Sequence, residues 1–316
     1  MKASFDHLYQ HARRAFTERY GAGEASAMAF ALLEDQYGAT RTDVLLGKDT
    51  DFSAEEHHDF EEIVKKIAEG TPMQHATGRA LFCGRYFKVT PDTLIPRPET
   101  EKAPLLLPPL GGGLEASESE SVKERSQRIR ALPLRGGDGG GLVLDCGTGS
   151  GCIAITIALE HPEWQVEAWD ISEGALAVAR ENAEALGAKN VTFHRKDILA
   201  EAEAVKESLP SSLQPLTLII SNPPYICRRE AAEMDANVLD HEPHTALFVP
   251  DDDPLLFYRA LAEIARARLL PGGSLIVECN RAYTQETAAL FQDYGFQNVE
   301  IINDCFDAPR FVRARK

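Results

Sequence analysis

The hydrophobic pattern of the chain changes character after its first 75 residues. Before that point, apolar residues recur at helical spacing in three segments, FDHLYQHARRAF, ASAMAFALLEDQY and SAEEHHDFEEIVKKIAEG. Ser53 and Glu56 form a capping-box pair at the start of the third segment, and no strand-like alternation accompanies these helices. The pattern predicts a small N-terminal helical bundle over residues 1–75.

Residues 76–102 have a different pattern. Two short β-prone runs, ALF and RYFKV, lie on either side of Cys83 and Gly84, and they predict a hairpin. The chain then enters TLIPRPETE, where Pro96 and Pro98 exclude a regular helix or a central strand. We expect this part of the chain to be a connector made of a hairpin and a rigid loop.

Residues 103–140 show neither the helical nor the strand-like spacing of apolar residues. The segment holds seven glycines and four prolines, and its acidic and basic residues balance. Such a composition is typical of a low-complexity insert, so we expect a mobile segment without chemistry of its own.

From residue 141 onward, strands and helices alternate. Seven runs are strand-like: LVLDC, QVEAW, VTFH, LTLIIS, SLIVEC, NVEIIND and PRFVRAR. Helical segments separate the first five runs, and a short turn joins the last two. Residues 141–316 are therefore predicted to form an α/β catalytic domain. Its Rossmann-like, mostly parallel seven-stranded sheet would carry an antiparallel edge hairpin and bind ligands at the carboxyl ends of its strands.

The charge balance narrows the possible partners. The 316 residues include 33 basic and 49 acidic side chains, which gives a net charge of −16, and residues 1–75 alone carry −6. Because a protein that binds nucleic acid backbones needs a basic surface, we expect no direct nucleic acid partner. No apolar run approaches the roughly 18–20 residues that span a bilayer, and the N-terminus lacks the apolar core of a secretory signal. We expect a cytoplasmic protein without a membrane partner.

The spacing of the six cysteines does not suggest a set of disulfide bonds. They are scattered along the chain, and none forms a CxxC pair. We therefore expect free thiols in a reducing compartment rather than disulfides or a structural zinc site.

A glycine-rich loop follows the first strand of the predicted sheet. Strand LVLDC runs into Gly147-Thr148-Gly149-Ser150-Gly151 and then into a helix. Alternate glycines let the backbone turn tightly and approach a ligand closely. The next strand ends in Asp170, a position that suits the two hydroxyls of a ribose. The sequence predicts a nucleotide-type cofactor in this loop.

The loop spacing favours a methyl donor over a dinucleotide. A dinucleotide loop reads G-x-G-x-x-G, whereas this loop reads G-x-G-x-G after Asp145. An acidic side chain there would repel a pyrophosphate but suits the ammonium group of S-adenosylmethionine. Further along, Asp197 could accept a hydrogen bond from an adenine amine while Ile198 packs on the ring; alternatively, Asp197 caps the helix that follows.

A second loop offers groups that could bind a planar nitrogen. Strand LTLIIS is followed by Asn222-Pro223-Pro224-Tyr225. The two prolines fix the backbone and leave carbonyl oxygens pointing outward, and the Asn222 amide both donates and accepts. With the flat ring of Tyr225, these groups could cradle an amide or an aromatic amine.

Five motifs together resemble one family. LIPRPETE, DCGTGSGCIAI, NPPYI, HEPHTALF and the ending PRFVRA are similar to those of the peptide chain release factor N5-glutamine methyltransferases, the HemK/PrmC family. The resemblance covers nearly the whole chain outside residues 103–140. It implies the class I S-adenosylmethionine-dependent methyltransferase fold, with a helical N-terminal domain that recognises the substrate.

The resemblance also implies a reaction. A methyl group would pass from S-adenosylmethionine to the side-chain amide nitrogen of the glutamine in the Gly-Gly-Gln motif of class I release factors. Asn222 and the Pro223 carbonyl would hold that amide, and Tyr225 would pack on it. The predicted site comprises catalytic Asn222, Pro223 and Tyr225; substrate-binding Asn222, Pro223, Pro224 and Tyr225; and cofactor-binding Asp145, Gly147, Thr148, Gly149, Ser150, Gly151, Asp170, Asp197, Ile198 and Asn222.

The chain departs from the family pattern at three places. The segment LIPRPETE usually runs into a helix that packs on the sheet, but here Ala103 and Pro104 lead into the insert. Cys146 replaces a more common aliphatic residue. Glu278-Cys279-Asn280 stands where the family usually has Glu-x-Gly, and since Asn tolerates left-handed backbone angles, we expect the turn there to be kept.

Other functions remain as alternatives. An N-methyltransferase acting on adenine or guanine in RNA or DNA shares the cofactor loop and NPPY, but the acidic charge opposes it. An inactive scaffold would not need the cofactor and substrate positions that are present, and an NAD-dependent dehydrogenase has no use for NPPY. The pair His241 and His244 lacks a third ligand, so no metal is expected.

Overall fold

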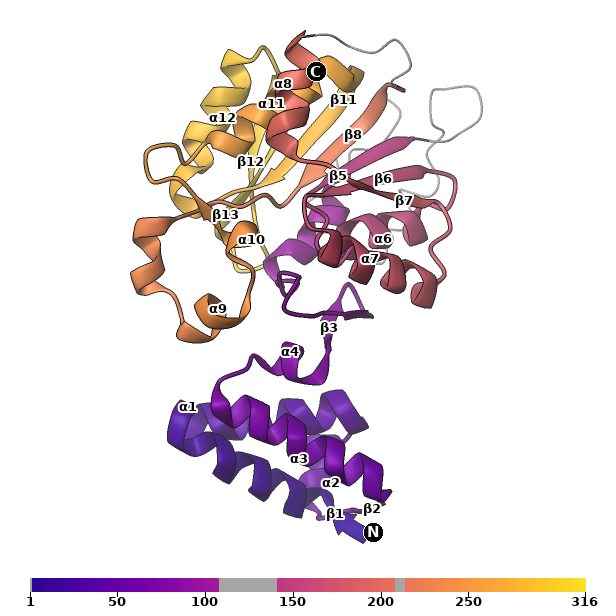
Figure 1. Cartoon of the computed structure of the whole chain (residues 1–316), viewed down its shortest axis with the longest axis vertical. Helices are drawn as coiled ribbons and strands as arrows, with labels where there is room; N and C mark the ends of the chain where they lie inside the picture. Colours follow the sequence, from indigo (N-terminus) through magenta and orange to yellow (C-terminus); the bar gives the residue numbers. More distant parts are fainter. Residues whose placement is uncertain (1, 108–140, 208–213) are drawn as a thin grey trace. The chain divides into compact units, whose positions relative to one another are not determined.

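The computed structural model describes residues 2–107, 141–207 and 214–316. Within these residues the chain forms two compact units. The first comprises the chain up to Arg79 together with Asp235–His241, and the second comprises Ala80–Met234 and Glu242–Lys316. Figure 1 labels the elements of both units. The part of the expected insert beyond residue 107 lies outside the described residues.

Helices dominate the first unit. The longest of them, α1, has a non-helical residue at Gly21, with φ of 76° and ψ of 162°, so the two helices expected there are joined end to end across a kink. Ser53 and Glu56 form the expected capping box, since each side chain bonds the backbone N–H of the other. The helices are α1 (Phe5–Tyr37), α2 (Arg41–Leu45), α3 (Ala54–Glu69), α4 (Met73–Thr77) and α9 (Ala236–His241).

Two strands in the first unit were not expected. β1 (Lys2–Ser4) pairs antiparallel with β2 (Asp49–Asp51) beside the helices. Each strand is three residues long. A run of this length is too short to show a two-residue period, so only the tertiary pairing reveals it.

The second unit contains the predicted seven-stranded sheet. Its strand order is β12-β13-β11-β8-β5-β6-β7. Six strands run in the same direction, and β13 runs in the opposite direction between β12 and β11. The fold expectation is confirmed, including the closing hairpin β12–β13. The strands are β5 (Leu142–Cys146), β6 (Gln165–Asp170), β7 (Val191–Arg195), β8 (Leu216–Ser221), β11 (Leu269–Glu278), β12 (Gln297–Asn303) and β13 (Pro309–Arg315).

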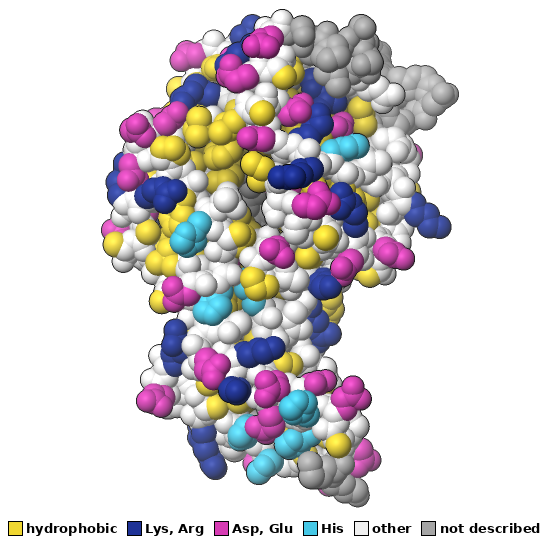
Figure 2. Space-filling view, viewed as in Figure 1, with side chains coloured by type: hydrophobic (Ala, Val, Ile, Leu, Met, Phe, Trp, Pro, Cys, Tyr) yellow, Lys and Arg dark blue, Asp and Glu magenta, His cyan; other side chains and the backbone are white. Residues whose placement is uncertain are grey.

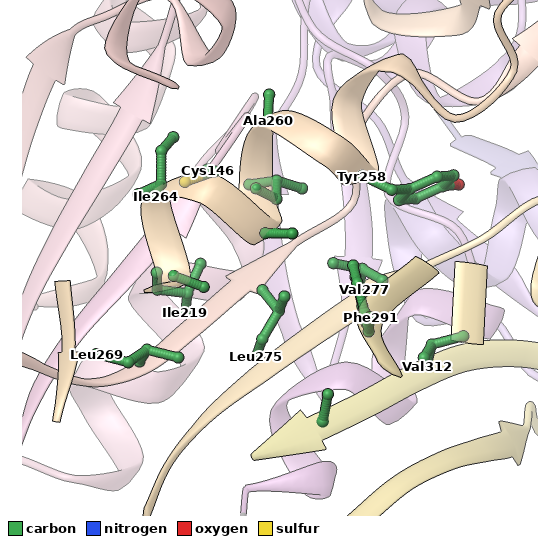
Figure 3. Packing of buried hydrophobic residues seen from close by; sticks show 14 of the residues in the cluster. Cys146, Ile219, Tyr258, Ala260, Ile264, Leu269, Leu275, Val277, Phe291 and Val312 are labelled. Carbon is green, nitrogen blue, oxygen red and sulfur yellow. The ribbon is translucent and has the colours of Figure 1, made fainter. Parts of the chain in front are cut away.

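Helices cover both faces of this sheet (Figure 1). Successive strand residues point to opposite faces, so Val143 of β5 joins one apolar cluster and Leu144 joins the other. The helices α8 (Ile198–Glu207), α11 (Leu256–Arg268) and α12 (Thr284–Asp293) pack on the face of Leu144. Figure 3 shows part of this cluster, including Tyr258 of α11 and Phe291 of α12. The helices α6 (Cys152–Glu160) and α7 (Glu173–Leu186) contribute to the opposite cluster.

The hairpin and the segment after LIPRPETE also pack on that opposite face. β3 (Arg79–Phe82) and β4 (Arg85–Lys88) form the expected hairpin, and Phe82 and Phe87 are buried in the cluster. The chain then forms a 3₁₀ helix, η1 (Glu99–Leu106). The insert was expected from residue 103, but Ala103, Leu106 and Leu107 are buried against the sheet. The end of this 3₁₀ helix therefore belongs to the packed domain rather than to the insert.

Short elements complete the second unit near the carboxyl ends of the strands. β9 (Ile226–Cys227) pairs in parallel with β10 (Phe248–Val249). The remaining elements are η2 (Arg228–Glu233), α10 (His244–Leu247) and η3 (Arg281–Tyr283).

Three other expectations concern the chain as a whole. Among the described helices, none is both long and apolar enough to cross a membrane. All six cysteines lie in the described part of the chain and are free thiols. Within that same part, no group of His, Cys, Asp and Glu is arranged to hold a metal ion.

Candidate functional site

A cleft of about 370 Å³ opens in the second unit, where the carboxyl ends of the central strands meet. Loops that follow β5, β6, β7 and β8 contribute to its walls, together with the start of LIPRPETE and the segment around HEPHTALF. The residues that line it are Asp92, Leu94, Gly147, Gly149, Asp170, Ile171, Ser172, Ala175, Lys196, Asp197, Ile198, Leu199, Asn222, Pro224, Arg228, Pro243, His244, Thr245, Ala246, Phe248 and Phe257.

The glycine loop needs its glycines for two different reasons. Gly147, Gly149 and Gly151 all have left-handed φ angles, of 75°, 55° and 81°. A Cβ on Gly151 would also lie 2.8 Å from Cδ1 of Ile155 and 3.1 Å from Cβ of Ala179, so a larger residue there would force these neighbours to shift. At Gly149, a Cβ would meet no atom within 4 Å, and this residue lines the cleft. The loop therefore presents bare backbone to the cleft.

The end of β6 holds this loop in place. The backbone N–H groups of Gly147 and Thr148 both donate to the Trp169 carbonyl, each over 2.9 Å. The N–H of Gly149 donates to Oδ2 of Asp170 over 2.9 Å. The loop and the acidic strand end are thus parts of one hydrogen-bonded structure.

Asp170 lies where the sequence places a ribose-binding carboxylate. Its Oδ1 accepts from the Ser172 N–H over 2.9 Å, and its Oδ2 accepts from Gly149. Burial raises the pKa of this carboxyl, and the N–H groups of Ser172 and Gly149 oppose that effect by stabilising the charged form. Each carboxylate oxygen keeps a further lone pair, so Asp170 can still accept hydrogen bonds from the cleft.

Asp145 does not line the cleft. Its side chain is fully buried, and its Oδ2 accepts from the Thr148 hydroxyl over 2.6 Å. Burial raises the pKa of Asp145 to about 7. Asp145 therefore supports the glycine loop through Thr148, and its contact with an ammonium group stays a prediction. Thr148 and Ser150 are buried as well and do not line the cleft.

Asp197 caps the helix that follows it, and its bond to an adenine amine stays a prediction. Its Oδ1 accepts from the Leu199 N–H over 2.9 Å at the start of α8, as a capping residue would. Asp197 and Ile198 also line the cleft, on the side away from Asn222 in the strand order.

The NPPY loop is divided between the cleft and the core. Asn222 and Pro224 line the cleft, whereas Pro223 and Tyr225 do not. The Tyr225 side chain packs against the core cluster, and its hydroxyl donates to Oε1 of Glu278 over 3.1 Å. Burial raises the pKa of this hydroxyl, so it remains a donor. Packing of Tyr225 on a substrate amide stays a prediction.

A buried hydrogen-bonded chain links Asn222 to β11. Nδ2 of Asn222 donates to Oγ1 of Thr100 over 3.3 Å, and Thr100 donates to Oε2 of Glu278 over 2.7 Å. Burial raises the pKa of Glu278 to about 7, against the stabilising hydrogen bond from Thr100 and the charge of Arg310. Sequence reasoning gave neither Thr100 nor Glu278 a role, although both lie in motifs that it singled out.

Asn280 overturns a further expectation. Its φ of −56° and ψ of 130° are not left-handed, so it does not replace glycine for conformational reasons. Its side-chain amide instead donates to the Tyr225 carbonyl over 3.2 Å and to Oε2 of Glu230 over 3.0 Å. Asn280 therefore braces the backbone just after the two prolines, which a glycine could not do.

A second missed pair joins LIPRPETE to HEPHTALF. Arg97 donates to Oε1 of Glu242 over 2.6 Å, and the Ile95 N–H donates to Oε2 of the same carboxylate over 3.2 Å. Glu242 is 4% exposed and Arg97 is partly exposed, so a buried carboxylate is paired with a half-buried guanidinium from a segment far away in sequence. Such a contact fixes the wall of the cleft that both segments supply.

Apolar cleft residues were also missed. Ile171 follows Asp170 directly, is 51% exposed and lines the cleft. Leu94, Phe248 and Phe257 add further apolar surface to the lining. The adjacency of Ile171 to Asp170 is the signal that could have identified it.

Comparisons with known proteins agree with the motifs. A methyltransferase domain profile matches residues 138–296, and a PrmC N-terminal domain profile matches residues 7–78. The chain is 39% identical over 304 residues to the release factor glutamine methyltransferase of Bacteroides thetaiotaomicron, covering 96% of this chain and 97% of that protein. It is 34% identical over 290 residues to that of Flavobacterium psychrophilum, covering 92% and 91%. The corresponding protein of Cereibacter sphaeroides is 38% identical over 257 residues, covering 81% and 78%.

Proposed function

The chain belongs to the release factor glutamine methyltransferases, and from this premise we propose how its cleft methylates a protein glutamine. The reaction transfers a methyl group from S-adenosylmethionine to the side-chain amide nitrogen of the glutamine in the Gly-Gly-Gln motif of class I peptide chain release factors. Because release factors act in translation, the enzyme would work in the cytoplasm.

The residues of the cleft fit the methyl donor. The glycine loop leaves open space at Gly149, Asp170 keeps free lone pairs for two hydroxyls, and Ile171 offers an exposed apolar face beside them. When bound, S-adenosylmethionine supplies a methyl group activated by its sulfonium charge. Gly147, Gly149, Asp170, Ile171, Asp197 and Ile198 would hold it.

One observation carries the assignment of the acceptor site. Asn222 lines the same cleft as the glycine loop, and its backbone oxygen lies 3.7 Å from where a Cβ on Gly147 would stand. The group that would hold the substrate amide therefore lies directly beside the loop that would hold the methyl donor.

The chemistry requires positioning more than acid–base catalysis. An amide nitrogen is a weak nucleophile because its lone pair is delocalised into the carbonyl. If the Asn222 side chain and the Pro223 carbonyl accept the two amide hydrogens, electron density shifts toward nitrogen and its direction of attack is fixed. The amide proton can leave after transfer, so no strong general base is needed.

The helical unit would engage the release factor. It carries the PrmC N-terminal profile and a net charge of −6 over residues 1–75, which suits a protein partner with a basic surface. The face shown in Figure 2 carries acidic and basic side chains interspersed rather than one basic field. That distribution does not favour the alternative function, methylation of adenine or guanine in nucleic acid.

A comparison of methyl transfer to separate substrates tests this assignment. Purified enzyme is incubated with labelled S-adenosylmethionine and, separately, a class I release factor, the same factor with its Gly-Gly-Gln glutamine changed to alanine, ribosomal RNA and DNA. We expect label only in the unaltered factor. Label in RNA or DNA, with none in the factor, would support the nucleic acid alternative and overturn the proposal.

A further inference from the structure

We propose that Thr100 and Glu278 are positioning residues that fix which way the Asn222 amide points, and thereby make its oxygen the acceptor for the substrate amide. The inference rests on the proposed function and adds to it the residues that orient Asn222. Neither residue touches the cleft; both would act through Asn222.

The directions of the hydrogen bonds follow from the chemistry of each group. An ionised carboxylate can only accept, so Glu278 takes the single proton of the Thr100 hydroxyl at Oε2, over 2.7 Å. That proton is then committed, and the Thr100 oxygen can only accept from Asn222. Asn222 must therefore turn its Nδ2 toward Thr100, where the distance is 3.3 Å.

The opposite orientation of the amide would be unfavourable. If Asn222 turned its Oδ1 toward Thr100, two acceptors would face each other with no proton between them. Leaving a buried polar group unsatisfied costs about 1–3 kcal/mol. The correct orientation leaves Oδ1 of Asn222 free, which is the atom that the substrate N–H needs.

Burial of Thr100 and Glu278, and a second hydrogen bond from the Tyr225 hydroxyl, keep these hydrogen bonds in one arrangement. Thr100 and Glu278 are 3% and 2% exposed, so water has little access to exchange the hydrogen bonds. The other oxygen of Glu278 accepts from the Tyr225 hydroxyl over 3.1 Å. One carboxylate therefore orders both the first and the last residue of the NPPY loop.

Two substitutions of Thr100 separate orientation from packing. Thr100→Val keeps the shape but removes the hydroxyl, and we expect kcat at saturating S-adenosylmethionine to fall by roughly 10- to 100-fold. Thr100→Ser keeps the hydroxyl and should retain at least half of the wild-type kcat. The Kd for S-adenosylmethionine, measured by calorimetry, should stay within about twofold of wild type in both, because Thr100 does not line the cleft and its side chain bonds neither the glycine loop nor Asp170.

The result with these variants decides the inference. Wild-type kcat in Thr100→Val would overturn it, as would an equal loss in Thr100→Ser. The wild-type enzyme is measured alongside: if it fails to methylate the release factor, the proposed function fails instead.

The pH profile gives a readout that simple loss of packing would not produce. The groups facing the Glu278 carboxyl are Thr100 and Glu99 of η1, Tyr225, and Arg310 of β13. Tyr258 of α11 donates to the backbone carbonyl of Glu278 instead. Burial raises the pKa of Glu278 to about 7, so its charged, accepting form predominates above that pH and is lost below it. A protonated Glu278 must donate to one of its partners, which disturbs the ordered directions. Wild-type kcat should therefore fall as the pH drops below about 7.

The isosteric variant Glu278→Gln identifies the source of that pH dependence. Glutamine does not titrate and its NH2 group must donate. At pH 8, kcat of the variant should be at least about tenfold below that of wild type, and it should not change over the pH range where the wild-type kcat falls. The same circular dichroism spectrum as wild type establishes that the variant is folded. A pH limb that persists unchanged in Glu278→Gln would contradict the inference.

Discussion

The variant Asn222→Ala is expected to lose about a thousandfold in the rate of methyl transfer to release factor. The side-chain oxygen of Asn222 is the one protein acceptor in the proposed site whose orientation is fixed by Thr100 and Glu278. Without it, the substrate amide loses both its alignment and the shift of electron density toward nitrogen. Single-turnover transfer with saturating S-adenosylmethionine measures this effect without interference from product release.

Cofactor binding distinguishes this result from unfolding. Since the glycine loop and Asp170 are untouched, Asn222→Ala should bind S-adenosylmethionine within a few-fold of wild type. Asn303→Ala is a matched control: Asn303 ends β12, lies outside the cleft and bonds only Asp307 among the described contacts of its side chain. It should transfer at the wild-type rate. Full activity in Asn222→Ala would contradict the proposal that Asn222 binds the substrate amide.

The second large effect is expected in the affinity for S-adenosylmethionine. Asp170→Asn keeps the shape of the side chain but replaces one accepting oxygen with an NH2 group. That group would face the N–H of either Gly149 or Ser172, both of which donate to the carboxylate in the native chain. A lost hydrogen bond to a charged group is worth about 1.5–3 kcal/mol, so the Kd should rise by roughly 10- to 150-fold.

Calorimetry with a charge control measures that change. Glu173→Gln removes a neighbouring negative charge at the start of α7, where Glu173 bonds Arg180 and does not line the cleft. It should leave the Kd unchanged within about twofold, because exposed charges contribute little. An unchanged Kd in Asp170→Asn would show that the carboxylate does not bind the methyl donor.

The fold could be predicted because its signals are local. Alternating strands and helices, the left-handed glycines and the capping box each depend on a few neighbouring residues. The sheet and its closing hairpin were therefore expected correctly, as were the helical segments that α1 joins, although their continuity across Gly21 was not. The strands β1 and β2 were missed because three residues carry no readable period.

The site could be predicted only in part, for a physical reason. The cleft positions of Gly147, Asp170 and Asn222 follow from their places at strand ends, which parallel topology brings together. The contact between Thr100 and Glu278 joins residues 178 apart, and no local pattern encodes such a pair. The burial of Asp145 and the backbone angles of Asn280 likewise depend on packing that the sequence alone does not show.

Tandem mass spectrometry of the release factor tests the central claim most directly. The factor is incubated with enzyme and S-adenosylmethionine, digested, and the peptide that contains the Gly-Gly-Gln motif is fragmented. The account predicts one added methyl group on the glutamine side chain in the wild-type reaction, and none with Asn222→Ala. An unmodified glutamine after exhaustive incubation with enzyme that binds S-adenosylmethionine, or a methyl group on another residue, would contradict it.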